Sequence, residues 1–137
     1  MSKSVLPAIA IMASMILAGC ATTVTPTSEA AQGTVLNGFG KSAPGTVPVV
    51  LKRDNGLMGG ACSHGLYVDG AAVANLRAGQ LVTVYLRPGP HIIGARPNGI
   101  CGGGDAEVEI TVREGRSNSV RVGSDQSGSL RIQPTAF

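Results

Sequence analysis

The second half of the chain alternates apolar and polar positions over short stretches that turn residues separate. Residues 106–113 are the clearest case, because Val108, Ile110 and Val112 share one face while acidic and polar residues fill the other. A period of two is typical of a strand that buries one face. Similar stretches lie at 47–51, 65–69, 73–76, 81–86, 91–96, 119–122 and 130–133.

Turn signals punctuate these stretches, and no apolar stripe with helical spacing appears among them. Asp69-Gly70 is a strong hairpin signal, and Arg87-Pro88-Gly89-Pro90 interrupts the chain before residue 91. About seven short strands with regular turns predict an all-β protein, a single small antiparallel β-sandwich. We place this domain at residues 46–137.

The segment before the domain has a different composition. Residues 21–45 are rich in Ala, Thr, Ser, Gly and Pro, carry two charges at Glu29 and Lys41, and show no sustained period. This composition predicts that residues 20–45 form a flexible tether, with a root-mean-square reach of roughly 25 to 30 Å. The alternative is that part of it, residues 34–39, lies down as an edge strand.

The first 19 residues have the layout of a secretory signal peptide. One positive charge at Lys3 precedes an apolar run from Val5 to Ala18, and small residues lead to Cys20. The run is shorter than the roughly 18 to 20 residues that a membrane-spanning helix needs. We therefore predict export, with residues 1–19 removed. The remaining chain has room for one domain.

Leu17-Ala18-Gly19-Cys20 resembles the bacterial lipobox. The resemblance implies that Cys20 carries diacylglycerol and an acyl chain such as palmitate, which together hold a protein firmly on a membrane. Ala21 stands where an aspartate would favour the inner membrane, so the resemblance implies the periplasmic face of the outer membrane. The alternative is an ordinary cleavage site beside a chance cysteine.

A second resemblance covers residues 66–95. Val68-Asp69-Gly70, followed by Leu76, Gly79, Val84-Tyr85-Leu86 and Pro88-Gly89-Pro90-His91-Ile92-Ile93, is similar to the PEGA-type β-sandwich module. The resemblance implies a structural or binding unit without catalytic residues. By the same resemblance, His91 is expected to hydrogen-bond its turn or the neighbouring strand.

Two cysteines remain once Cys20 is assigned to lipid. Cys62 and Cys101 form an even number in an exported domain, and a disulfide is the default in an oxidising compartment. Closing the loop between them contributes roughly 4 kcal/mol in the chain-entropy model. Glycines 102–104 would then supply backbone freedom beside the bond.

Other chemistry finds less support. A phosphate-binding loop would need a helix after the glycines, and a strand is predicted there. Cys62, His64, Cys101 and Asp105 are weak candidates for a metal site, because their spacing is not that of a zinc finger. No nucleophile, base and orienting group can be assembled. We expect no enzyme activity and no cofactor.

Charge and aromatic content limit the class of partner. The chain has 11 basic and 8 acidic residues, without clustering, and only four aromatic residues: Phe39, Tyr67, Tyr85 and Phe137. Nucleic-acid binding is therefore not expected.

Our leading hypothesis is a lipid-anchored, non-catalytic accessory module that binds an envelope protein through a sheet edge or end loops. The alternative is an inhibitor or immunity lipoprotein that blocks an envelope-attacking enzyme. Its candidate binding loop consists of Gly123, Ser124, Asp125, Gln126, Ser127 and Gly128. A third hypothesis is a metal carrier or metal-dependent enzyme that uses Cys62 and His64.

Overall fold

The computed structural model describes residues 22–56 and 60–137, and these residues form nine strands and no helix. The strands are β1 (Ala31–Gln32), β2 (Val47–Arg53), β3 (His64–Val68), β4 (Ala71–Leu76), β5 (Gln80–Leu86), β6 (Gly89–Pro97), β7 (Ala106–Val112), β8 (Ser119–Ser124) and β9 (Leu130–Pro134). The all-β prediction is confirmed, with nine strands rather than about seven. Within the described part of the chain, nothing has the length and apolarity of a membrane-crossing helix.

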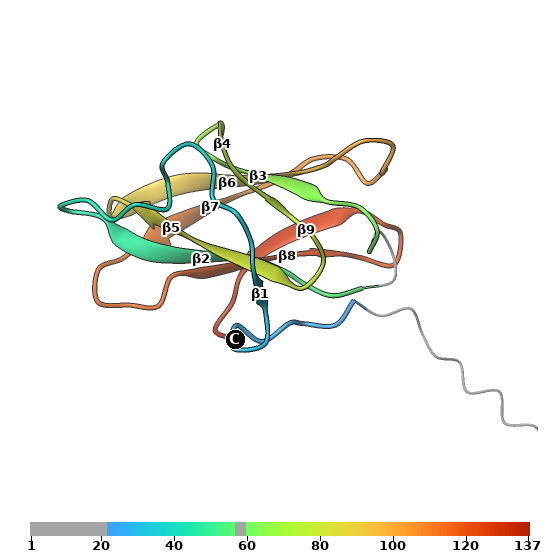
Figure 1. Cartoon of the computed structure of the whole chain (residues 1–137), viewed down its shortest axis with the longest axis horizontal. Coiled ribbons are helices and arrows are strands. Elements are labelled where there is room, and N and C mark those ends of the chain that lie inside the picture. The colour runs from blue at the N-terminus through green and yellow to red at the C-terminus, as the bar shows by residue number, and fades with distance from the viewer. Residues whose placement is uncertain (1–21, 57–59) are drawn as a thin grey trace, which may run out of the picture.

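The strands form two sheets that pack face to face (Figure 1). One sheet has the order β1-β5-β2-β8-β9 and the other the order β4-β3-β6-β7. The four-stranded sheet is antiparallel throughout, whereas β2 runs parallel to β8 and β1 runs parallel to β5 in the five-stranded sheet. The sandwich is therefore mixed rather than purely antiparallel, because β8 returns beside β2 after the chain has crossed the other sheet.

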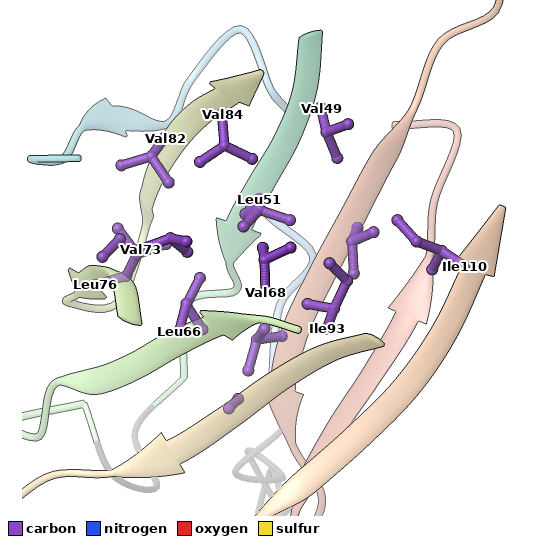
Figure 2. Packing of buried hydrophobic residues seen from close by; sticks show 14 of the residues in the cluster. Val49, Leu51, Leu66, Val68, Val73, Leu76, Val82, Val84, Ile93 and Ile110 are labelled. Carbon is purple, nitrogen blue, oxygen red and sulfur yellow. The ribbon is translucent and has the colours of Figure 1, made fainter. Parts of the chain in front are cut away.

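The core lies between the two sheets and is aliphatic (Figure 2). Alternate residues of each strand point into it, as the sequence pattern predicts. In β7, for example, Ile110 and Val112 are buried, Val108 packs against the core, and Glu107 and Glu109 are exposed. Burial of such side chains is the main force that holds the sheets together.

The predicted hairpin turn joins β3 to β4. Asp69 and Gly70 both have positive φ, 49° and 83°, as a two-residue hairpin turn of this type requires. His91 secures the turn, as expected: its Nδ1 lies 2.6 Å from Asp69 Oδ2 and its Nε2 lies 2.8 Å from Arg87 O. Burial disfavours the charged form of His91, but these hydrogen bonds outweigh it and raise its pKa.

Residues 22–45 differ from the predicted flexible tether. Thr23 bridges Asn55, residues 31 and 32 form β1 beside β5, and Val35 bridges Ala74. The domain therefore begins by Thr23 and not at residue 46. The alternative, an edge strand at residues 34–39, agrees better with the structure, although the strand is at 31–32 and residues 34–39 contribute a single bridge at Val35. The signal peptide and Cys20 lie outside the described residues and stay predictions.

Candidate functional site

The sandwich has two lateral sides, each bordered by the edge strands of both sheets. We call the side bordered by β1 and β4 the closed side, and the side bordered by β7 and β9 the open side. Both sides are open to unwanted pairing, because an edge strand presents unpaired main-chain groups to any other extended chain.

The closed side is covered by the segment that follows β1. Gly33 N–H donates to Leu81 O of β5 at 2.7 Å, and Leu36 N–H donates to Val73 O of β4, also at 2.7 Å. Farther along, Phe39 O accepts a hydrogen bond of 2.8 Å from Tyr85 N–H. Residues 31–39 therefore satisfy main-chain groups of both sheets on this side.

The open side has no such cover among the described residues. Cα atoms of β7 and β9 approach within 8 Å of each other, yet β7 pairs only with β6 and β9 only with β8 in the described part of the chain. The two sheets thus come close at this side without joining.

In the described part of the chain, β7 directs main-chain groups to this edge where no strand pairs with them. Ile92 of β6 exchanges hydrogen bonds with Asp69, which lies on its β3 side. Because main-chain direction alternates along an antiparallel strand, Ile93 faces β7, where Val108 is its partner. The main-chain groups of the intervening β7 residues therefore face away from β6; these are Glu107, Glu109 and Thr111.

The edge of β9 is less receptive than that of β7. Thr135 N–H donates to Ser119 O at 2.9 Å, so by the same alternation Leu130, Ile132 and Pro134 face away from β8. Pro134 has no N–H, and the N–H of Leu130 is directed to Gly103 O at 3.4 Å. Proline and a covering loop are common protections of an edge, so β7 is the less protected of the two edges.

A cleft of about 600 Å³ opens beside the carboxyl end of β7. Its walls come from β7, the β7–β8 turn, the start of β8 and the residues after β9: Glu109, Ile110, Thr111, Arg113, Ser117, Asn118, Ser119, Val120, Pro134, Thr135 and Ala136. It combines apolar surface with one acidic and one basic side chain at its walls. Such a mixture suits a peptide better than a strongly charged small molecule.

The wall formed by the turn is held by its own hydrogen bonds. Asn118 accepts from Arg113 N–H at 3.0 Å and donates to Arg113 O at 2.9 Å, while its own carbonyl accepts from Val50 N–H. Ser119 follows, and its Oγ is buried with no hydrogen-bond partner among the described residues. Buried hydroxyls ordinarily have a partner, so this buried atom has unused hydrogen-bonding capacity in a residue that lines the cleft.

The predicted disulfide forms between Cys62 and Cys101, whose Cα atoms are 6.2 Å apart. It joins the segment before β3 to the β6–β7 loop, the loop whose Gly103 O faces Leu130. The bond therefore fixes the covering loop of β9. Glycines 103 and 104 have positive φ, which is the backbone freedom expected beside the bond.

The weak metal candidates are divided by the fold. His64 lines a hollow of about 320 Å³ together with Cys62 and Cys101, whose sulfurs are bonded to each other, whereas Asp105 pairs with Arg96 at 3.0 Å. Among the described residues no three His, Cys, Asp or Glu side chains come together to hold a metal. His64 is instead a core residue, 3% exposed. Burial, with the nearby Arg53 charge, lowers its pKa to about 4.

The candidate binding loop at 123–128 is a turn closed on itself. Gly123 and Ser124 end β8, and Asp125 Oδ1 accepts from the main chain of Ser127 and Ser129 at 2.9 and 3.0 Å. Asp125 also pairs with Arg131 at 3.0 Å. The Ser127 hydroxyl is the main cause of the lowered pKa of Asp125. The polar groups of the turn thus serve its own geometry.

Ser119 and the outward main chain of β7 were not identified from the sequence. The alternation at 106–113 revealed which face of β7 is buried, but edge position depends on strand order. Compared with models of protein families, with curated proteins and with solved structures, the chain matched none.

Proposed function

We propose that this protein is a lipid-anchored, non-catalytic module of the cell envelope that binds an extended segment of a partner protein along β7. The anchor is Cys20, and the location that the lipobox resemblance implies is the periplasmic face of the outer membrane. The observation that carries the binding role is the outward main chain of Glu107, Glu109 and Thr111 beside the cleft. Addition of a strand to such an edge is a recurring mode of peptide recognition.

The charge of β7 favours a partner other than a second copy of this chain. Glu107 and Glu109 are both exposed on the same face of β7. Two β7 strands paired antiparallel about this stretch would bring acidic side chains of both copies close together, and like charges opposite one another destabilise a sheet. A segment with neutral or basic side chains at alternate positions fits this edge.

A proline substitution separates edge pairing from side-chain contact. Thr111→Pro removes an N–H that faces away from β6, so the β6–β7 ladder stays intact. Thr111→Ala keeps this N–H and is the matched control. A photoreactive phenylalanine replaces Arg113 at the cleft in the full-length protein, which is then crosslinked in living cells. The same probe in place of the exposed Ala71 on β4 serves as the control position.

We expect a discrete protein adduct from position 113 and none from position 71. Loss of one edge hydrogen bond and a clash with the incoming strand should reduce the adduct at least about tenfold in Thr111→Pro, with little change in Thr111→Ala. Equal adducts in the two variants, or no adduct at position 113, would refute binding along β7.

A further inference from the structure

The outer face of the five-stranded sheet is covered by the two ends of the described chain. Lys52 points to this face, because its neighbour Leu51 points into the core. The Lys52 ammonium donates to Thr25 O at 2.8 Å, to Thr27 Oγ1 at 3.3 Å and to Phe137 O. These bonds hold residues 25–27 beside Phe137. In Figure 1 the end marked C lies next to the blue amino-terminal stretch of the described chain.

Further contacts fix the start of this segment. Thr22 Oγ1 donates to Ser124 O at 2.5 Å, Thr25 N–H donates to Asp54 Oδ1 at 3.3 Å, and Asp54 pairs with Arg121 at 3.3 Å. Lys52 is fully buried, and burial lowers its pKa. So many polar contacts beneath one short segment show that its position is built into the fold.

This segment presents two exposed apolar residues, Val24 and Pro26, among polar ones. Val24 is 37% exposed and Phe137 is 76% exposed. Together with Pro26, Thr27 and Ser28 they line a shallow hollow of about 500 Å³ whose surface is mostly apolar. We call Val24, Pro26 and Phe137 the apolar patch. Large exposed apolar residues that gather in one place commonly mark a contact with a membrane or another protein.

The short stretch of chain between Cys20 and the apolar patch favours a membrane over another protein as the surface that the patch contacts. Cys20 is two residues before Thr22, so about 7 Å of extended chain separates them at most. Val24 is four residues from Cys20, about 14 Å at most by the same measure. A diacylated Cys20 would lie at the membrane surface, so the apolar patch would be within the thickness of the headgroup region.

We propose that the protein docks on the lipid surface through the apolar patch, with the outer face of the five-stranded sheet towards the membrane. This inference rests on the proposed lipid anchor at Cys20. Arg121 and Arg131 line the adjoining hollow with Val24 and Asp54, and each guanidinium group is already paired with a carboxylate, that of Asp54 or Asp125, so the docking rests on the apolar patch. In this orientation the open side faces along the membrane plane, which leaves β7 accessible to a partner.

The absence of tryptophan from the chain makes the test direct. Val24→Trp places a single tryptophan in the apolar patch. Ile92→Trp is the matched control, because Ile92 is 38% exposed and belongs to β6 in the opposite sheet. Full-length protein is purified in detergent and reconstituted into phosphatidylethanolamine–phosphatidylglycerol vesicles that contain lipids brominated on their acyl chains. Phe137→Trp is a second probe of the patch.

Val24→Trp and Phe137→Trp should be quenched at least about twofold more strongly than Ile92→Trp, because only the patch enters the interface. Equal quenching at all three positions, or none at 24 and 137, would overturn the docking. The mass of the intact protein is measured first. A protein without lipid would overturn the anchor and the docking together, whereas a lipidated protein whose tryptophan at position 24 is not quenched would overturn the docking alone.

Discussion

The closed and open sides of the sandwich meet the same physical problem in different ways. On the closed side, residues 31–39 donate to or accept from main-chain groups of β4 and β5. On the open side, β9 is protected by Pro134 and Gly103, while β7 keeps three outward-facing residues beside a cleft. Within the described part of the chain, β7 is thus the edge strand with the least protection, and an unprotected edge invites pairing with another extended chain.

The chain on the closed side also explains the short distance between the domain and its proposed anchor. Residues that composition assigns to a tether instead pair with β5, bridge to the edge strand β4 and cover the outer face of the five-stranded sheet. Little chain then remains between Thr22 and Cys20. With the proposed lipid anchor at Cys20, this short connection would hold the domain close to the membrane and would leave the open side free for the proposed partner.

The largest expected effect concerns β3, which lies between the two sides. His64 begins β3 and is paired with Leu76 of β4 and Pro97 of β6. Its folded-state pKa of about 4 lies below the ordinary 6.5, so the unfolded chain takes up the proton first as pH falls. Stability should therefore decrease from about pH 6.5 down to pH 4 and then level off, by about 3 kcal/mol in all.

Urea unfolding at pH 7 and pH 4 measures this loss, with His64→Leu as the comparison. The difference between wild type and variant isolates the contribution of His64 from that of other groups. β3 pairs with β4 directly and is connected to β7 through β6. Amide exchange should therefore accelerate in β4 and β7 together on acidification. Acceleration in only one of the two strands would show that the sides unfold independently.

The next prediction concerns a substitution that disturbs the closed side alone. A Cβ on Gly33 would lie 2.7 Å from Leu76 Cδ2 and 3.2 Å from Leu81 O, and Leu76 is fully buried and has little room to move. Gly33→Val should cost about 2 kcal/mol of unfolding free energy by overpacking. The N–H of Leu36 should also exchange faster, because its hydrogen bond to Val73 O belongs to the same cover.

Gly102→Val is the control for this substitution. A Cβ on Gly102 meets nothing within 4 Å, and its φ is not in the left-handed region. Chemical denaturation and amide exchange at Leu36 are compared in both variants. If Gly33→Val were as stable and as protected as Gly102→Val, the segment 31–39 would not be a tight cover, and the contrast between the two sides would fail.

Side-chain periodicity and the number of cysteines account for what could be predicted from the sequence. Val108, Ile110 and Val112 identified the buried face of β7, and the even number of cysteines after Cys20 identified the Cys62–Cys101 bond. Neither signal describes pairing between distant strands. The parallel pairing of β2 with β8 and the cover of the closed side depend on main-chain hydrogen bonds, which leave no pattern in residue type.

The smallest effect concerns the open side and separates stability from binding. Ser119 Oγ is buried without a partner among the described residues. Burial of such a group costs desolvation free energy that no hydrogen bond offsets. Ser119→Ala should therefore leave the free protein unchanged or stabilise it by less than about 1 kcal/mol. If a bound segment uses this hydroxyl, the same variant should weaken the adduct formed at position 113 severalfold. A variant that is less stable when unbound would show that Ser119 already has a structural partner, and the cleft would then offer only the β7 edge.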